Sequence, residues 1–397
     1  MLKIKLIKIF LIDKIYSEKF FCGGFEMNKK LLRNAILGLT LSAGIFSANF
    51  VDAAKPIVLE TQGSFAVGGK TVKHSGTFSE KNFLSPEGQS AYGDHLYTFY
   101  QIPVKAKKYP IIFQHGGAQS KRTWESTPDG RDGFQNIFLR KGYSVYLVDQ
   151  PRIGEAGLAT EPVGSGNVWA GNPLYADKTL FILSRVGTFD GDIPHVFDNS
   201  AFPKDSESVN QFQRSWTNYT SELDNDLNAD ALAKLFDKVG PSILFGHSMG
   251  GTICWRTVFR TDNVKAIVAF EPGGTPFVFP EGEVPEAEKA NFEVLGASAM
   301  AVPLEDFMKL TKIPIILYYG DNIDLNSNHT GKNKWATELD MAKKFVEDVN
   351  RHGGQAELVE LPKVGIKGNT HFLMADLNNE KLADLAADWL KSKGLDK

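Results

Sequence analysis

Residues 242–251 read Ser-Ile-Leu-Phe-Gly-His-Ser-Met-Gly-Gly. A short apolar run breaks at Gly246, and a pair of glycines then opens a segment that can continue as a helix. This order predicts a strand, a sharp turn and a helix, with Ser248 at the tip of the turn. Such a turn brings strand and helix so close that only glycine fits on either side of the serine. The same residues also fit a plain Gly-Ser turn, so the rest of the chain must decide.

The flanking sequence alternates buried runs with segments of helical periodicity. The runs are short, β-branched and aromatic, as in parallel strands covered on both faces: 109–113, 143–148, 242–245, 264–270, 313–319 and, more weakly, 355–361. Helices are predicted between them at 132–141, 221–239, 252–260, 332–352 and 379–391. This alternation predicts an α/β fold, with one mostly parallel central sheet and helices on both faces.

Residues 55–103 differ from this pattern, because they alternate as strands and hairpins do. We expect antiparallel lead-in strands here, with a turn at Gly68-Gly69.

Two connections, 151–220 and 272–311, are too long to be simple loops. Long insertions in compact domains tend to be functional, so we interpret 151–220 as a lid over the site. Its aromatic residues could instead pack a small core of its own; among them are Trp169, Tyr175, Phe181, Phe189 and Trp216.

The 397 residues are 42% hydrophobic and 23% charged, a composition typical of soluble globular proteins. Residues 27–53 resemble a signal peptide, with a basic start at Met27, an apolar stretch and small residues before a cut after Ala53. Residues 1–26 fit no role in the fold, and we interpret them as an extension upstream of the true start. Residues 54–397 are then a single domain of a periplasmic or secreted bacterial protein without a membrane anchor. Because that part is mildly acidic, nucleic-acid binding is not expected.

The two cysteines are Cys22, which falls in the discarded part, and Cys254, which we expect to be a buried apolar residue. The sequence contains no zinc-type His-Glu-x-x-His, no Cys/His metal set, no phosphate loop and no dinucleotide fingerprint. We therefore expect neither a metal nor another cofactor.

A serine nucleophile requires a base, an orienting carboxylate and donors for an oxyanion, in the chain order serine, acid, histidine. Of the eight histidines, only three follow Ser248. His371 precedes the last helix, where the base is expected. His352 is more simply a helix-terminal cation, and His329 lies in a polar loop. His247, inside the turn, is expected to point away from the reacting centre.

Two carboxylates could orient the base. Asp321 ends the strand at 313–319, the position most folds of this kind use, although it could simply cap the following loop. Glu271 ends the strand at 264–270, where a carboxylate is costly unless it is paired. It could equally belong to a structural ion pair, and position alone favours Asp321.

The oxyanion donors are expected to be backbone N–H groups. One should be Met249, directly after the serine. The other should be Gly117 in the loop His115-Gly116-Gly117-Ala118, which a plain Gly-Gly turn would also explain.

Together these residues resemble the α/β-hydrolase superfamily, and more narrowly the esterase 713-like family of bacterial serine esterases. The likeness covers nearly all of the chain after residue 53 outside the insertion. It rests on the strings at 115–116 (His-Gly), 123–131 (Thr-Trp-Glu-Ser-Thr-Pro-Asp-Gly-Arg), 138–144, 148–150, 270–273 (Phe-Glu-Pro-Gly), 368–371 (Gly-Asn-Thr-His) and 376–379. In that family the acid stands in a Glu-Pro-Gly context, so the resemblance implies Glu271 rather than Asp321. Relatives can carry cysteines where Gly117 and Ala118 stand here.

The sequence thus predicts a hydrolase that cleaves small carboxylic esters through an acyl-enzyme on Ser248, His371 and Glu271. A lactonase or amidase with the same triad, or a catalytically silent binding protein of this fold, are the alternatives. Whether the chain is a monomer or a homodimer is left open.

Overall fold

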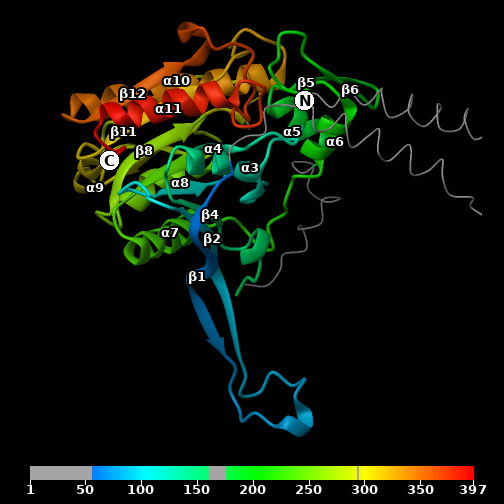
Figure 1. The fold of residues 1–397 in the computed structure, drawn as a ribbon, viewed down its shortest axis with the longest axis vertical. Coiled ribbons are helices and arrows are strands. Elements are labelled where there is room, and N and C mark those ends of the chain that lie inside the picture. Colours follow the sequence, from blue (N-terminus) through cyan, green and yellow to red (C-terminus); the bar gives the residue numbers. More distant parts are fainter. Residues whose placement is uncertain (1–55, 161–175, 293–294) are drawn as a thin grey trace, which may run out of the picture. The chain divides into compact units, whose positions relative to one another are not determined.

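A central sheet organises the protein (Figure 1). The computed structural model describes residues 56–160, 176–292 and 295–397. The segments 1–26 and 27–53 lie outside these residues, as do Trp169 and Tyr175. In the described chain the sheet has the order β1-β2-β4-β3-β7-β8-β11-β12. Its strands are β1 (Leu59–Lys73), β2 (Ser90–Pro103), β3 (Ile111–Gln114), β4 (Val145–Asp149), β7 (Ser242–His247), β8 (Val264–Phe270), β11 (Pro314–Tyr319) and β12 (Gln355–Glu360).

The predicted mostly parallel sheet is confirmed. β1 and β2 are antiparallel to their neighbours, whereas β4, β3, β7, β8, β11 and β12 run parallel. Parallel strands end at the same edge of a sheet, and ligands of such sheets bind beyond that edge. The residues that follow β7, β8 and β11 are therefore neighbours in space.

Helices cover both faces of the sheet because alternate strand residues point to opposite sides. In β7, Ile243 and Phe245 belong to one buried cluster with residues of α4 (Phe134–Arg140) and α11 (Asn379–Ser392). Leu244 belongs to the other cluster. That cluster contains residues of α7 (Asn225–Val239), α8 (Gly250–Val258), α9 (Leu304–Leu310) and α10 (Thr330–Arg351). Cys254 of α8 is buried, as predicted.

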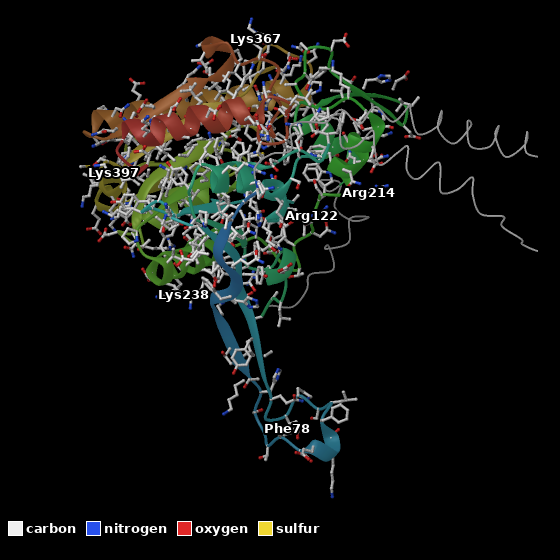
Figure 2. The ribbon with its side chains drawn as sticks, viewed as in Figure 1. Phe78, Arg122, Arg214, Lys238, Lys367 and Lys397 are labelled. Carbon is white, nitrogen blue, oxygen red and sulfur yellow. The ribbon has the colours of Figure 1, made fainter. Side chains whose placement is uncertain are left out.

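The turn predicted at Gly68-Gly69 is wrong. β1 continues through both glycines and pairs with β2 from Val67↔Leu96 to Lys70↔Gly93. Gly68 and Gly69 have φ of 67° and 84°, and Asp94 on the opposite strand has 56°. Positive φ is compatible with a chain-reversing turn, but it is equally compatible with a bend inside two strands that stay paired. The chain reverses instead at residues 74–89, which include η1 (Glu80–Asn82) and Phe78 (Figure 2).

The first long connection has secondary structure of its own. Its described part holds η2 (Gly154–Ala156), α5 (Asp177–Leu183), the hairpin β5 (Gly187–Asp190) and β6 (Ile193–Val196), and α6 (Ser206–Gln213). Phe212 contacts Phe202 and Trp216 within the connection, and it also contacts Phe372 with ring centroids 5.0 Å apart. These aromatics therefore form a core that continues to the residue after His371.

The remaining elements are short. The second connection holds the parallel pair β9 (Phe277–Pro280) and β10 (Ala299–Val302). α3 (Arg122–Glu125) follows β3, and η6 (Leu361–Val364) follows β12. Among the described residues, no helix is both long and apolar enough to span a bilayer.

Candidate active site

The turn after β7 holds Ser248 in an unusual backbone conformation. Its φ is 56°, in the left-handed region that residues other than glycine seldom adopt. Hydrogen bonds on both sides fix the turn: Ser248 N donates to Phe270 O at 3.0 Å, and Gly251 N donates to Ser248 O at 2.9 Å. The serine thus stands between the end of β7 and the start of α8, as predicted for a nucleophile elbow.

Glycines permit this close crossing. A Cβ at Gly246 would lie 2.5 Å from Cys254 Sγ, and one at Gly250 would lie 2.6 Å from His115 O. A Cβ at Gly116 would lie 2.7 Å from Ser248 Cβ. The loop after β3 therefore rests directly against the serine.

His371 lies in the loop between η6 and α11. Its backbone N–H donates to Ser184 O at 2.9 Å, and its ring stacks on Trp335 with centroids 3.8 Å apart. Its Nδ1 is 2.7 Å from Oε2 of Glu271. Because a carboxylate only accepts hydrogen bonds, the ring proton belongs on Nδ1, and Nε2 keeps its lone pair.

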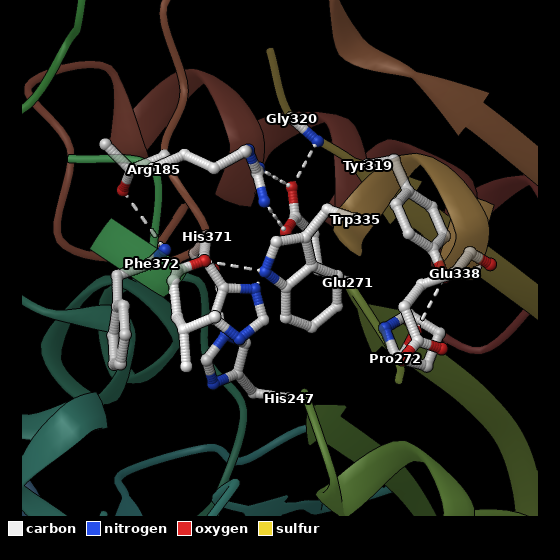
Figure 3. A network of polar contacts seen from close by, with 12 residues as sticks. Arg185, His247, Glu271, Pro272, Tyr319, Gly320, Trp335, Glu338, His371 and Phe372 are labelled. Carbon is white, nitrogen blue, oxygen red and sulfur yellow. Dashed lines mark hydrogen bonds and ion pairs between the residues drawn. The ribbon is translucent and has the colours of Figure 1, made fainter. Parts of the chain in front are cut away.

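Glu271 directly follows β8 and is fully buried. Figure 3 shows its carboxylate between His371 and Arg185. Arg185 donates from Nη1 to Oε2 at 2.9 Å and from Nη2 to Oε1, and Gly320 N donates to Oε1 at 2.7 Å. Glu271 is thus both the partner of a histidine and a member of a buried ion pair, which were alternatives on the sequence.

Asp321 follows β11, but its carboxylate accepts hydrogen bonds from backbone N–H groups of nearby loops. Oδ1 accepts from Asn322 N at 2.7 Å, and Oδ2 accepts from Gly368 N at 2.8 Å. The structure therefore brings Glu271, and not Asp321, into contact with His371.

The prediction for His247 is wrong, because its side chain packs against His371 instead of pointing away. The two rings lie 4.5 Å apart, and His247 Nε2 is 2.8 Å from His371 O. Its Nδ1 contacts the side-chain amide of Gln119. The residue before the nucleophile thus supports the loop that carries the histidine, a role that depends on a contact between distant parts of the chain.

The two residues that carry the predicted oxyanion donors are in contact. A Cβ at Gly117 would overlap the sulfur of Met249. Within the described residues, the backbone N–H groups of Gly117 and Met249 donate to no protein acceptor. Ala118 follows with φ of 57°. Neither N–H group is thus engaged by another part of the described chain.

Comparison with known proteins settles the family. The model of the alpha/beta hydrolase family matches residues 111–340, which include Ser248 and Glu271. The chain belongs to this family. A fungal protein named "Probable secreted lipase phiG" is 25% identical to this hydrolase over 330 residues, covering 75% of this chain and 86% of its own. A solved structure described as a novel bacterial esterase is 29% identical, with a TM-score of 0.66 over 85% of this chain and 98% of its own.

The surroundings of His371 in this hydrolase favour a neutral imidazole. Burial lowers the pKa of His371 well below its usual value, and the cations of Arg185 and Lys334 lower the pKa further. A neutral ring is the form that can accept a proton.

Asp376 fixes the loop that carries His371. Its buried carboxyl accepts from Thr370 N at 2.8 Å, from Thr370 Oγ1 at 3.0 Å and from Asn369 Nδ2 at 3.1 Å. Burial, and more weakly the charge of Glu271, raises the pKa of Asp376 to about 7. Asn369 and Thr370, just before His371, are thereby hydrogen-bonded to Asp376, which follows it.

Sequence reasoning missed Arg185 and Trp335. Both are buried against the His371–Glu271 pair, but they come from the first long connection and from α10. No local pattern marks either residue, because each acquires its role only through tertiary contacts.

In the described chain, one group of side chains could hold a metal ion: Glu283, Asp348 and His352. Arg351 already forms ion pairs with both carboxylates. The group contains none of the candidate-site residues described above.

Gly250→Ala tests how tightly the elbow is packed. Its Cβ would meet the backbone oxygen of His115, which cannot swing aside, so we expect a loss of about 1–3 kcal/mol in the free energy of unfolding. This exceeds the gain of at most about 1 kcal/mol from the better helix propensity of alanine. Urea unfolding measures the change.

Gly296→Ala is the matched control, since its Cβ would meet nothing closer than 3.6 Å. Its stability should stay within about 0.5 kcal/mol of the parent. Equal stability of both variants would contradict the close crossing.

Proposed function

We propose that this hydrolase is a serine esterase, which cleaves carboxylic esters through an acyl-enzyme on Ser248, His371 and Glu271. The observation that carries the proposal is the 2.7 Å contact between His371 Nδ1 and Glu271 Oε2. His371 reaches the elbow because its ring packs on His247, the residue before Ser248. The names of the fungal lipase and the bacterial esterase support ester bonds as the substrate class.

In the first step Ser248 Oγ attacks the ester carbonyl carbon, and His371 Nε2 takes the hydroxyl proton. Glu271 stabilises the imidazolium that forms, since its carboxylate already accepts from Nδ1. The carbonyl electrons move onto oxygen, where the N–H groups of Gly117 and Met249 donate to the developing charge. A single donor of this kind contributes about 10²- to 10³-fold to the rate in other hydrolases.

The tetrahedral intermediate then collapses. Its C–O bond to the alcohol breaks, and His371 returns the proton to the leaving alkoxide. Water attacks the acyl-enzyme by the same route, which releases the acid and restores Ser248. No step needs a group beyond the residues named.

We further propose that the protein is exported. Residues 27–53 have the pattern of a signal peptide, and the fungal relative is named as secreted.

Ser248→Ala tests the nucleophile. The variant should lose hydrolysis of a short p-nitrophenyl ester and covalent labelling by a fluorophosphonate, because alanine has no oxygen to acylate. Enzyme assay and intact-mass spectrometry measure both. Retained turnover by a folded variant would refute the mechanism, and absence of labelling in the parent would favour a silent binding protein.

Glu271→Gln and Asp321→Asn, compared side by side, test the acid. The glutamine should lower kcat by about 10⁴-fold, because it neither stabilises the imidazolium nor holds the ring in the right tautomer. Asp321→Asn should stay within about tenfold of the parent, because the carboxylate of Asp321 accepts from loop N–H groups and not from His371. Loss of activity in the second variant alone would make Asp321 the acid.

Export can be tested by expressing the whole chain in a bacterial host and sequencing the N-terminus of protein from the periplasm and medium. We expect Ala54 as the first residue. Exported protein that keeps residues before Met27 would contradict the proposed start, and protein retained in the cytoplasm would contradict export.

A further inference from the structure

Three consecutive residues of the first long connection, Leu183, Ser184 and Arg185, each contact a different part of the candidate site. Leu183 O accepts from Trp335 Nε1 at 2.8 Å, and Trp335 stacks on the ring of His371. Ser184 O accepts from His371 N at 2.9 Å. Arg185 pairs with the carboxylate of Glu271. This part of the connection is therefore a wall of the site and not merely a cover.

Arg185 makes the most demanding of these contacts. It is fully buried, and two N–H groups of its planar fork meet the two oxygens of Glu271. Its Nε donates to Asp321 O at 3.0 Å, which ties the fork to the end of β11. A guanidinium that engages a carboxylate in this way fixes the plane of the carboxylate as well as its charge. That plane decides whether Oε2 faces His371 Nδ1.

The backbone at Arg185 adds to this interpretation. Its φ is 57°, a conformation that costs an ordinary residue free energy and persists only when the surroundings impose it. Arg185 N donates to Ile182 O, so the strained turn directly follows α5. The turn directs the side chain into the interior.

The charged and titratable groups around His371 come from five segments. Glu271 follows β8, Arg185 follows α5, and Lys334 lies on α10, paired with Glu338 at 2.8 Å. His247 ends β7, and Asp376 lies in the histidine's own loop. Burial keeps the pKa of His247 well below its usual value, so this ring is neutral. Arg185 and Lys334 are thus the two cations that oppose protonation of His371.

We propose that Arg185 is a positioning residue, by which residues 176–220 of the connection orient the Glu271 carboxylate toward His371 Nδ1. The proposal rests on the proposed esterase function. It makes the docking of Leu183–Arg185 against His371 and Glu271 a condition for assembling the acid and the base. Arg185 also compensates the buried negative charge of Glu271. Without this cation, the carboxylate would stabilise the protonated imidazolium form of His371 in the resting enzyme, and that form cannot act as a base.

Arg185→Met and Arg185→Lys test the proposal through the pH dependence of kcat/KM for a p-nitrophenyl ester. Methionine removes the cation and leaves Glu271 uncompensated, and both changes favour the imidazolium. The midpoint of the acid limb should therefore move up by about one unit or more. kcat should fall about tenfold or more, since the carboxylate is no longer held in place. KM should change little, because Arg185 is buried behind Glu271.

Lysine keeps the charge but not the fork. Arg185→Lys should therefore restore the midpoint of the acid limb while recovering only part of kcat. The pH midpoint of the acid limb does not depend on which fraction of the preparation is folded. If Arg185 only stabilised the fold, Arg185→Met would therefore leave this midpoint unchanged.

Arg152→Met is the matched control. Arg152 is also a buried arginine of the same connection, with φ of 72° and both oxygens of the buried Asp94 as partners. Its loss should lower the melting temperature, as for Arg185→Met, without moving the acid limb.

An unchanged acid limb in Arg185→Met would overturn the proposal, as would an equal shift in Arg152→Met. Should Arg185→Met not fold, Arg185→Lys decides: an unchanged limb with a kcat that is reduced per fluorophosphonate-labelled site supports positioning, and full kcat overturns it. Activity retained by Ser248→Ala would instead refute the esterase mechanism itself. The two failures are thus distinguishable.

Discussion

The buried ion pair between Arg185 and Glu271 is the constraint on which the site depends. A carboxylate without solvent is tolerated only when hydrogen-bond donors and a countercharge surround it. Glu271 has both, from Arg185, Gly320 N and His371 Nδ1. Since these partners come from separate segments, the carboxylate joins the first long connection, the ends of β8 and β11 and the loop before α11.

The parallel sheet makes this convergence possible. β7, β8 and β11 are adjacent and parallel, so the residues after them meet at one edge. Ser248 and Glu271 follow directly from that topology, and Asp321 lies within the same region. Local hydrogen bonds decide which carboxylate contacts His371. The carboxylate of Asp321 accepts from Asn322 N and Gly368 N instead. A family likeness in the Glu-Pro-Gly string, and not strand order, pointed to the residue that the structure brings to the histidine.

The sequence-based errors have a common physical origin. Gly68-Gly69 signals positive φ, but only pairing with β2 tells whether the chain turns or bends there. His247 was placed by the local geometry of the elbow, whereas its side chain is held by Gln119 and His371 O, far away in the chain. Arg185 carries no local signal at all. Each error concerns a contact between distant segments, which periodicity and spacing do not encode.

Local sequence patterns were enough to predict the α/β class, the strands and helices of the sheet, the elbow around Ser248 and the candidate histidine. These follow from local rules: apolar periodicity, glycine at close crossings and the chain order of the candidate residues. Three features became visible only in the folded chain: Glu271 faces His371, Arg185 and Trp335 enclose the pair, and Leu183–Arg185 forms part of the site wall. Burial and charge pairing depend on which segments meet, and that is settled only when the chain is folded.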